Sequence, residues 1–143
     1  MDDDKPLAKE GYALMGAAFE VHRELGGGLA EEIYQQSLQI ELGIRGIPFR
    51  AKQELVAFYK GVALEKKYVP DLYVFDKIVV ELKSVSALAP EHEAQLMNYM
   101  RITRHPVGYL INFAPIQKVE WSRFVLSEYV GRINVERNEE GNR

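Results

Sequence analysis

The stretch "PDLYVFDKIVVELKS", residues 70–84, consists of two apolar runs of strand-forming residues on either side of the turn sequence FDK. This pattern is typical of a β-hairpin. Pairing Val74 with Ile78 across FDK places Asp71 directly opposite Glu81. Side chains in such a pair have Cβ atoms about 4.5–5.5 Å apart, and like charges there are destabilising. The hairpin therefore predicts two carboxylates that need compensation beside a buried strand.

An ammonium group accompanies these carboxylates. Lys83 follows Glu81 by two residues, so a strand places both side chains on one face. Such a cluster can share a proton, form a salt bridge, or hold a divalent cation such as Mg²⁺, which prefers oxygen ligands and often binds substrate phosphates as well. The spacing alone is weak evidence, since Glu65 and Lys67 repeat it in a polar segment with Leu55, not an acid, ten residues earlier. Catalysis and a plain salt-bridged hairpin both remain open at this point.

Length and composition indicate one globular domain. The chain has 143 residues, of which 47% are hydrophobic and 27% charged, so disorder is not expected for most of it. We expect a single domain at 8–134 between flexible tails at 1–7 and 135–143. The chain has no cysteine, which excludes disulfides, thiol nucleophiles and cysteine-based zinc sites and favours a cytoplasmic location. No apolar run approaches the roughly 18 residues of a membrane span, so no membrane association is expected.

The charge balance limits the kinds of partner that the chain is expected to bind. The formal net charge is −3, which counts against a module that binds nucleic acid by bulk electrostatics alone. The negative net charge is weaker evidence against an enzyme that binds the phosphate through metal cations. Basic residues do gather in one segment, where they form either a solvated strand edge or a phosphate track: Arg50, Lys52, Lys60, Lys66 and Lys67.

The order of elements predicts an α/β fold, a sheet with helices packed on it. Apolar residues at helical spacing predict helices from 8 to 25, from 29 to 42 and over "APEHEAQLMNYMRITR". Alternating or continuous apolar residues predict strands. Their expected ranges are 49–59, 62–74 with a break near Pro70, and 78–84, followed by "VGYLINF" in the interior. "KVEWSRFVL" is expected to be an outer strand or a strand followed by a turn of helix.

Two helices carry polar residues that could belong to the same site. In "GLAEEIYQQSL", Glu31 lies on the side of Tyr34 and therefore borders the buried arc, although a glutamate in a first turn can simply complement the helix dipole. Gln95 and Tyr99 are four residues apart and face the same way, as a pair at the margin of a core also would. His92, one turn earlier, could reach the same cleft.

These residues together resemble a known family. Asp71 followed by Glu81-Leu82-Lys83 at the end of an apolar strand resembles the signature of the PD-(D/E)XK nuclease superfamily. "GLAEEIYQQSL", with Gly28, Glu31 and Tyr34, resembles the motif that names the GxxExxY family within it. The preceding "FEVHRELGGG" and the later "PEHEAQLMNYM" are similar to the same family.

The spacing of Gln95 and Tyr99 resembles the QxxxY motif of the RecB-type exonuclease branch. The similarity covers residues 8 to 124, with the motifs in family order. It implies a restriction-endonuclease-like α-β-β-β-α-β core, a central mixed sheet flanked by helices. Four agreeing motifs are far more specific than any one of them.

The resemblance also implies a metal site. Asp71 and Glu81 would ligate Mg²⁺, for which Mn²⁺ can substitute, and the carbonyl of Leu82 would join them. Glu31 would assist from the first core helix. Lys83 would serve the attacking water and the transition state. Gln95 and Tyr99 would position the lysine or a substrate phosphate.

The implied function is a metal-dependent nuclease that hydrolyses phosphodiester bonds, with DNA as the expected substrate, in repair or restriction. The alternative is a non-catalytic module on the same fold that binds nucleic acid or a protein. No separate recognition domain is visible, so a homodimer or a targeting partner protein is an open expectation.

Overall fold

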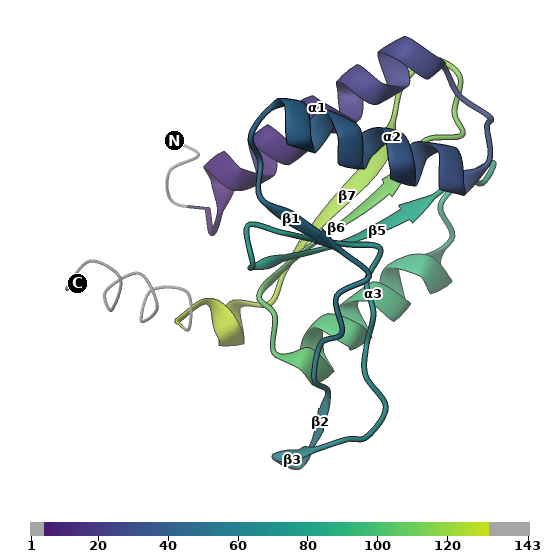
Figure 1. The fold of residues 1–143 in the computed structure, drawn as a ribbon. Helices are drawn as coiled ribbons and strands as arrows, with labels where there is room; N and C mark the ends of the chain where they lie inside the picture. Colours follow the sequence, from purple (N-terminus) through teal and green to yellow (C-terminus); the bar gives the residue numbers. More distant parts are fainter. Residues whose placement is uncertain (1–4, 132–143) are drawn as a thin grey trace.

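Two helices open the described part of the chain, which runs from residue 5 to 131 in a computed structural model (Figure 1). They are α1 (Ala8–Leu25) and α2 (Glu31–Ile44). Leu7, which the sequence places in the N-terminal tail, is 2% exposed and packs in the core. The expected tail at 135–143 lies outside the described residues.

A five-stranded sheet forms the centre of the molecule, in the order β1-β4-β5-β6-β7. Its strands are β1 (Phe49–Ala51), β4 (Leu72–Val74), β5 (Ile78–Lys83), β6 (Val107–Asn112) and β7 (Glu120–Val125). Strands β5 and β6 are parallel and the other neighbours are antiparallel. Helix α3 (Pro90–Thr103) connects β5 to β6, and the short 3-10 helix η2 (Ser127–Tyr129) follows β7. The predicted α-β-β-β-α-β core with a mixed sheet is confirmed.

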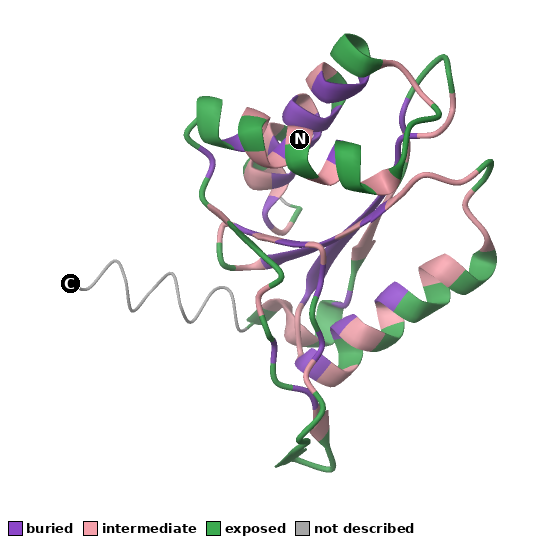
Figure 2. Cartoon of the chain, turned by 45° about the vertical axis from the view of Figure 1, so that its right-hand side comes forward, coloured by how far each residue is buried: buried purple, intermediate pink, exposed green. Residues whose placement is uncertain are grey.

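Helices cover both faces of this sheet: α1 and α2 lie on one face and α3 on the other (Figures 1 and 2). Side chains alternate along β5. Val80 and Leu82 pack in the core under α1 and α2, whereas Val79 packs with Leu96 and Met100 of α3. Glu81, which follows Val79 by two residues, therefore faces α3.

The predicted hairpin register is confirmed. Val74 pairs with Ile78, and Leu72 pairs with Val80. The turn uses left-handed backbone at Phe75 (φ 58°) and Asp76 (φ 55°). The ladder ends at Leu72, the first residue of β4, and Asp71 immediately precedes it.

The two long strands predicted at 49–59 and 62–74 are wrong in extent. β1 ends at Ala51, and β4 begins only at Leu72. Between them, β2 (Phe58–Tyr59) and β3 (Val62–Ala63) form a separate hairpin that projects from the sheet (Figure 1). The first strand breaks where Lys52 has a left-handed φ of 54°, and the second breaks at Pro70, which has no N–H to offer a ladder. The predicted turn at Lys60-Gly61 is confirmed, since both have positive φ.

The later predictions are confirmed. Helix α3 begins at Pro90, and all six residues of β6 are buried between β5 and β7. β7 is the outer strand expected from its alternation. Among the described residues, no helix is both long and apolar enough to cross a membrane.

Candidate active site

Asp71 is held by three different elements. The N–H of Leu82 in β5 donates to Oδ2 of Asp71 at 2.8 Å, and Nζ of Lys52 donates to Oδ1 at 2.7 Å. The side-chain amide of Gln35 in α2 donates to the backbone carbonyl of Asp71 at 2.8 Å. Only 14% of the Asp71 side chain is exposed. The carboxylate is therefore fixed beside the end of β5.

Glu81 lies next to this carboxylate, on the face of β5 that meets α3. The pKa of Glu81 is raised from 4.5 to about 7, chiefly by burial and secondly by the negative charge of Asp71. A hydrogen bond from Tyr68 and the charge of Lys83 act in the opposite direction. The carboxyl of Glu81 is therefore expected to be partly protonated at neutral pH. Shifted pKa values of this kind are common at functional sites.

Two tyrosines support Glu81. The hydroxyl of Tyr68 donates to Oε1 of Glu81 at 2.5 Å. Burial, followed by the nearby charge of Glu81, raises the pKa of Tyr68, so its hydroxyl keeps its proton and remains a donor. The ring of Tyr68 stacks on Tyr99 of α3, with ring centroids 4.1 Å apart and nearly parallel planes. Tyr99 therefore supports Glu81 indirectly, by packing against Tyr68, which donates the hydrogen bond to Glu81.

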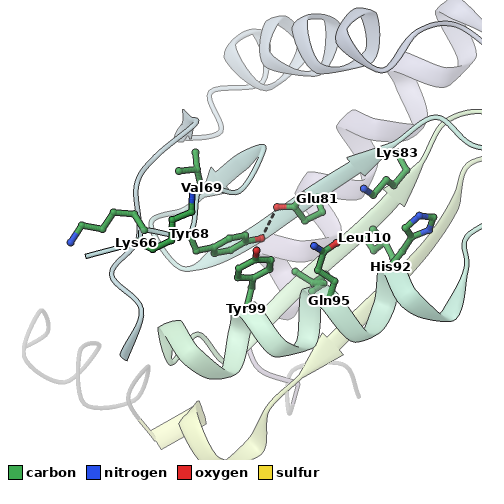
Figure 3. A pocket seen from close by; sticks show the side chains of 11 residues that line it. Lys66, Tyr68, Val69, Glu81, Lys83, His92, Gln95, Tyr99 and Leu110 are labelled. Atoms are coloured by element: carbon green, nitrogen blue, oxygen red, sulfur yellow. Dashed lines mark hydrogen bonds between the residues drawn. The ribbon is translucent and has the colours of Figure 1, made fainter. Parts of the chain in front are cut away.

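A cleft of about 380 Å³ opens between β5, α3 and the segment before β4. Glu81 and Lys83 of β5 line one side of it, and Gln95 and Tyr99 project from α3 on the other side (Figure 3). His92 also lines the cleft, and its Nδ1 accepts a hydrogen bond from the N–H of Ala89 at the start of α3. Lys66 and Lys67 also line the cleft and carry positive charge.

Glu31 approaches the acids from the other helical layer. It occupies the first turn of α2 and is partly buried. Burial, followed by the charge of Asp71, raises the pKa of Glu31, whereas the charges of Lys83 and Lys52 lower it. Glu31 is therefore in electrostatic contact with the hairpin, although the lining of the cleft does not include it or Asp71.

The loop that positions Glu31 is anchored by Tyr34. This fully buried tyrosine donates from its hydroxyl to the carbonyl of Gly26 at 2.6 Å and accepts from the N–H of Leu29 at 3.1 Å. Its ring stacks on Phe113 at a centroid distance of 4.7 Å. The sequence pattern on this helix thus has a structural basis, in which Tyr34 fixes the start of α2.

The predicted site residues divide into two groups. Lys83, Gln95 and Tyr99 share the cleft with Glu81, whereas Asp71 and Glu31 adjoin it. Over residues 5–131, no group of three or more histidine, cysteine, aspartate or glutamate side chains is arranged to hold a metal ion. What the hairpin provides is a pair of carboxylates. Mg²⁺ often binds through one or two carboxylates and keeps several waters.

Comparison with known proteins identifies the family. A model of the PD-(D/E)XK nuclease superfamily matches residues 8–124. The chain belongs to the PD-(D/E)XK nuclease superfamily. None of the curated proteins compared matches it.

Two solved structures are similar to this chain at low sequence identity, and the first of them shares its fold. The crystal structure of SSO0001 is 17% identical, with a TM-score of 0.51 over 89% of this chain and 59% of that one. The alkaline exonuclease LHK-Exo from Laribacter hongkongensis is 14% identical, with a TM-score of 0.47 over 76% of this chain and 66% of that one. The chain thus spans less than two thirds of the length of either neighbour.

PD-(D/E)XK nucleases generally use divalent metal ions, and the donors in this chain fit one. Asp71 and Glu81 supply hard oxygen ligands, and the backbone carbonyl of Leu82 lies between Glu81 and Lys83 in sequence. The negative charge of Asp71 adds to burial in raising the pKa of Glu81, so it makes that carboxyl harder to ionise. A divalent cation would offset that effect.

Three residues of this PD-(D/E)XK site were not predicted from the sequence: Lys52, Tyr68 and Gln35. The pairing of Ala51 with Leu72 extends to place Lys52 across from Asp71, but that pairing could not be derived without the strand order. Gln35 lies one helical turn after Glu31, so the i, i+4 rule could have identified it.

Proposed function

We propose that this chain hydrolyses phosphodiester bonds of nucleic acid, DNA in particular, in a reaction that depends on a divalent cation. Mg²⁺ would be the physiological ion, and Mn²⁺ would substitute for it. The observation that carries the proposal is the proximity of half-buried Glu81 to Asp71 at the side of a cleft that also contains Lys83.

The acidic residues have assigned roles in this proposal. Asp71, Glu81 and the Leu82 carbonyl would hold the cation, and Glu31 would assist from α2. When bound, the cation would supply Lewis acidity and lower the pKa of a coordinated water. The hydrogen bond from Leu82 and the one from Tyr68 orient the two carboxylates before any ion arrives.

The remaining residues would act on the water and the phosphate. Lys83 lies on the same face as Glu81, so its ammonium can orient the attacking water and offset negative charge on the phosphate. Gln95 lines the cleft across from Glu81 and can donate to a phosphate oxygen. Tyr99 supports Tyr68 by stacking and positions the site from α3.

Within the superfamily, we assign the chain to the GxxExxY family. Its motif residues are Gly28, Glu31 and Tyr34. Gly28 has a φ of 89°, which favours glycine, and Tyr34 anchors the loop that leads to Glu31. In this proposal, Gly28 and Tyr34 shape the loop before α2, and the loop holds Glu31 near Asp71.

The partners and the compartment also remain predictions. A role in DNA repair or restriction follows from the proposed activity, and a homodimer or a targeting protein would supply recognition. A cytoplasmic location is proposed from the absence of cysteine.

The proposal is tested by incubating purified protein with labelled single- and double-stranded DNA and RNA in Mg²⁺ or Mn²⁺. Wild type is expected to cleave DNA, and EDTA, Glu81→Gln or Lys83→Met to reduce the rate at least ~100-fold, the usual contribution of such groups. Cleavage that survives both substitutions would reveal a contaminant. Binding of DNA without cleavage, in every metal tried, would favour the non-catalytic module.

A further inference from the structure

The ammonium of Lys52 contacts a carboxylate of the proposed metal site. Its Nζ lies 2.7 Å from Oδ1 of Asp71. The two side chains differ in freedom, since that of Lys52 is 59% exposed and that of Asp71 only 14%. Lys52 is therefore the partner that can move away without disturbing the core.

The backbone directs Lys52 toward this contact. Lys52 follows the last residue of β1 and has a φ of 54°, in the left-handed region that few residues other than glycine adopt. Its N–H points at the carbonyl of Asp71, 3.4 Å away. Unusual backbone of this kind concentrates at functional sites. Here it ends strand β1 and places the Lys52 side chain beside Asp71.

Lys52 is surrounded by the same negative charges that a divalent cation in the proposed site would contact. The pKa of Lys52 is raised by its hydrogen bond to Asp71 and also by the charges of Asp71, Glu81 and Glu31. All three acids of the proposed metal site thus act on this one ammonium. The other oxygen of Asp71 is occupied by the N–H of Leu82, which belongs to the sheet and cannot leave.

We propose that Lys52 is a resident counter-cation of the metal site, whose ammonium neutralises Asp71 while the site holds no divalent cation and leaves Oδ1 when one binds. The inference rests on the proposed function. Mg²⁺ binds carboxylate oxygens at about 2.0–2.1 Å, so an ion on Oδ1 would lie within a few ångströms of the ammonium. Two cations at that separation repel each other strongly, and the exposed side chain of Lys52 gives way.

This arrangement couples two properties of the protein. Without metal, Lys52 offsets the repulsion between Asp71 and Glu81. When a divalent cation binds, it must compete with the ammonium, so part of its binding free energy is spent on displacing Lys52. Removing the ammonium therefore weakens the metal-free fold and strengthens metal binding, whereas a residue that merely positions Asp71 would weaken both.

The test is titration calorimetry with Mn²⁺ in the absence of nucleic acid, on wild type, Lys52→Met and Lys52→Arg. Lys52→Met is expected to bind Mn²⁺ roughly threefold to tenfold more tightly, as for the loss of one exposed ion pair and one like charge. Lys52→Arg keeps the charge and is expected to stay within about twofold of wild type. Lys66→Met is the control, because Lys66 lines the cleft from an exposed position outside the hydrogen bonds of Asp71.

Thermal unfolding gives a second readout with the same proteins. In EDTA, Lys52→Met is expected to have a lower melting temperature than wild type. Mn²⁺ is expected to raise the melting temperature of Lys52→Met by more than it raises that of wild type. Unchanged or weaker Mn²⁺ binding by Lys52→Met, with wild type binding normally, would overturn the role of Lys52 alone. Equal tightening by Lys66→Met would also overturn it. If neither wild type nor Lys52→Met binds Mn²⁺, the proposed function fails as well.

Discussion

The hydroxyl of Tyr68 donates a 2.5 Å hydrogen bond to Oε1 of Glu81, across the segment that leads into β4. Tyr68 in turn stacks on Tyr99 of α3. A hydrogen bond to the charged form of a carboxylate favours that form, so Tyr68 opposes the effect of burial on the pKa of Glu81. The pKa of the proposed metal ligand Glu81 thus depends on a tyrosine that packs against α3.

Tyr68→Phe removes this donor and is expected to raise the pKa of Glu81 further. Because a metal ion displaces the proton from a carboxyl ligand, the pH of half-maximal Mn²⁺ binding should rise by about 0.5–1, the equivalent of one modest hydrogen bond. Calorimetric titrations between pH 5.5 and 8.5 measure it. Tyr99→Phe keeps the stacked ring and serves as the control. An unmoved midpoint in Tyr68→Phe would show that the bond does not tune Glu81.

The stability of the metal-free protein should depend on the proton at Glu81. The pKa is raised from 4.5 to about 7 in the folded state, so the folded protein holds the proton more tightly than the unfolded chain does. The resulting stabilisation is complete below about pH 4.5 and is lost as the pH rises through about 7. Glu81→Gln cannot lose a proton and should escape that loss.

Urea unfolding in EDTA at several pH values between 5 and 8.5 compares the two proteins. The free energy of unfolding of wild type should fall relative to that of Glu81→Gln as the pH rises. Glu91→Gln, at an exposed position of α3, should follow wild type. Parallel curves for wild type and Glu81→Gln would contradict the assignment.

Tyr34→Phe should loosen the loop before α2. The substitution leaves the carbonyl of Gly26 and the N–H of Leu29 without their partner, at a cost of about 1–3 kcal/mol in the free energy of unfolding. Urea unfolding measures the loss. Tyr12→Phe, at a side chain that is 85% exposed, should change it by less than about 0.5 kcal/mol. Equal effects of the two substitutions would rule out an anchoring role for the Tyr34 hydroxyl.

Gly27→Ala should disturb the same loop by a steric route. A Cβ at Gly27 would lie 2.5 Å from the backbone oxygens of Ala114 and Pro115, which cannot withdraw as a side chain can. We expect a loss of about 1–3 kcal/mol, as for overpacking, measured by thermal unfolding. Gly43→Ala meets no atom within 4 Å and lies in α2, so it should stabilise the protein by up to about 1 kcal/mol. A neutral Gly27→Ala would mean that the loop moves freely.

Local signals in the sequence were sufficient for the centre of the fold. The turn at FDK determined the register of Val74 with Ile78, and the unbroken apolar run of β6 showed that this strand is interior. Pro90 marked the start of α3. Each of these features depends on residues that are close in the chain.

The unpredicted features depend on pairings that are distant in the chain. The break after β1 arises where Lys52 turns toward Asp71, nineteen residues away. Tyr68 reaches Glu81 only because the segment before β4 passes alongside β5 and α3. Propensity and spacing carry no information on these two contacts, so the acids and Lys83 were predicted, whereas Lys52 and Tyr68 were not.

The central claim is that Asp71 and Glu81 share a divalent cation, and anomalous diffraction from crystals soaked in Mn²⁺ at about pH 8 tests it most directly. We predict an anomalous peak between the two carboxylates, with the Leu82 carbonyl as a further ligand at roughly 2.0–2.2 Å, and Nζ of Lys52 displaced from Asp71. The peak should vanish in Asp71→Asn crystals. A wild-type crystal saturated with Mn²⁺ but without a peak at this pair, or with one elsewhere in the cleft, would contradict the account.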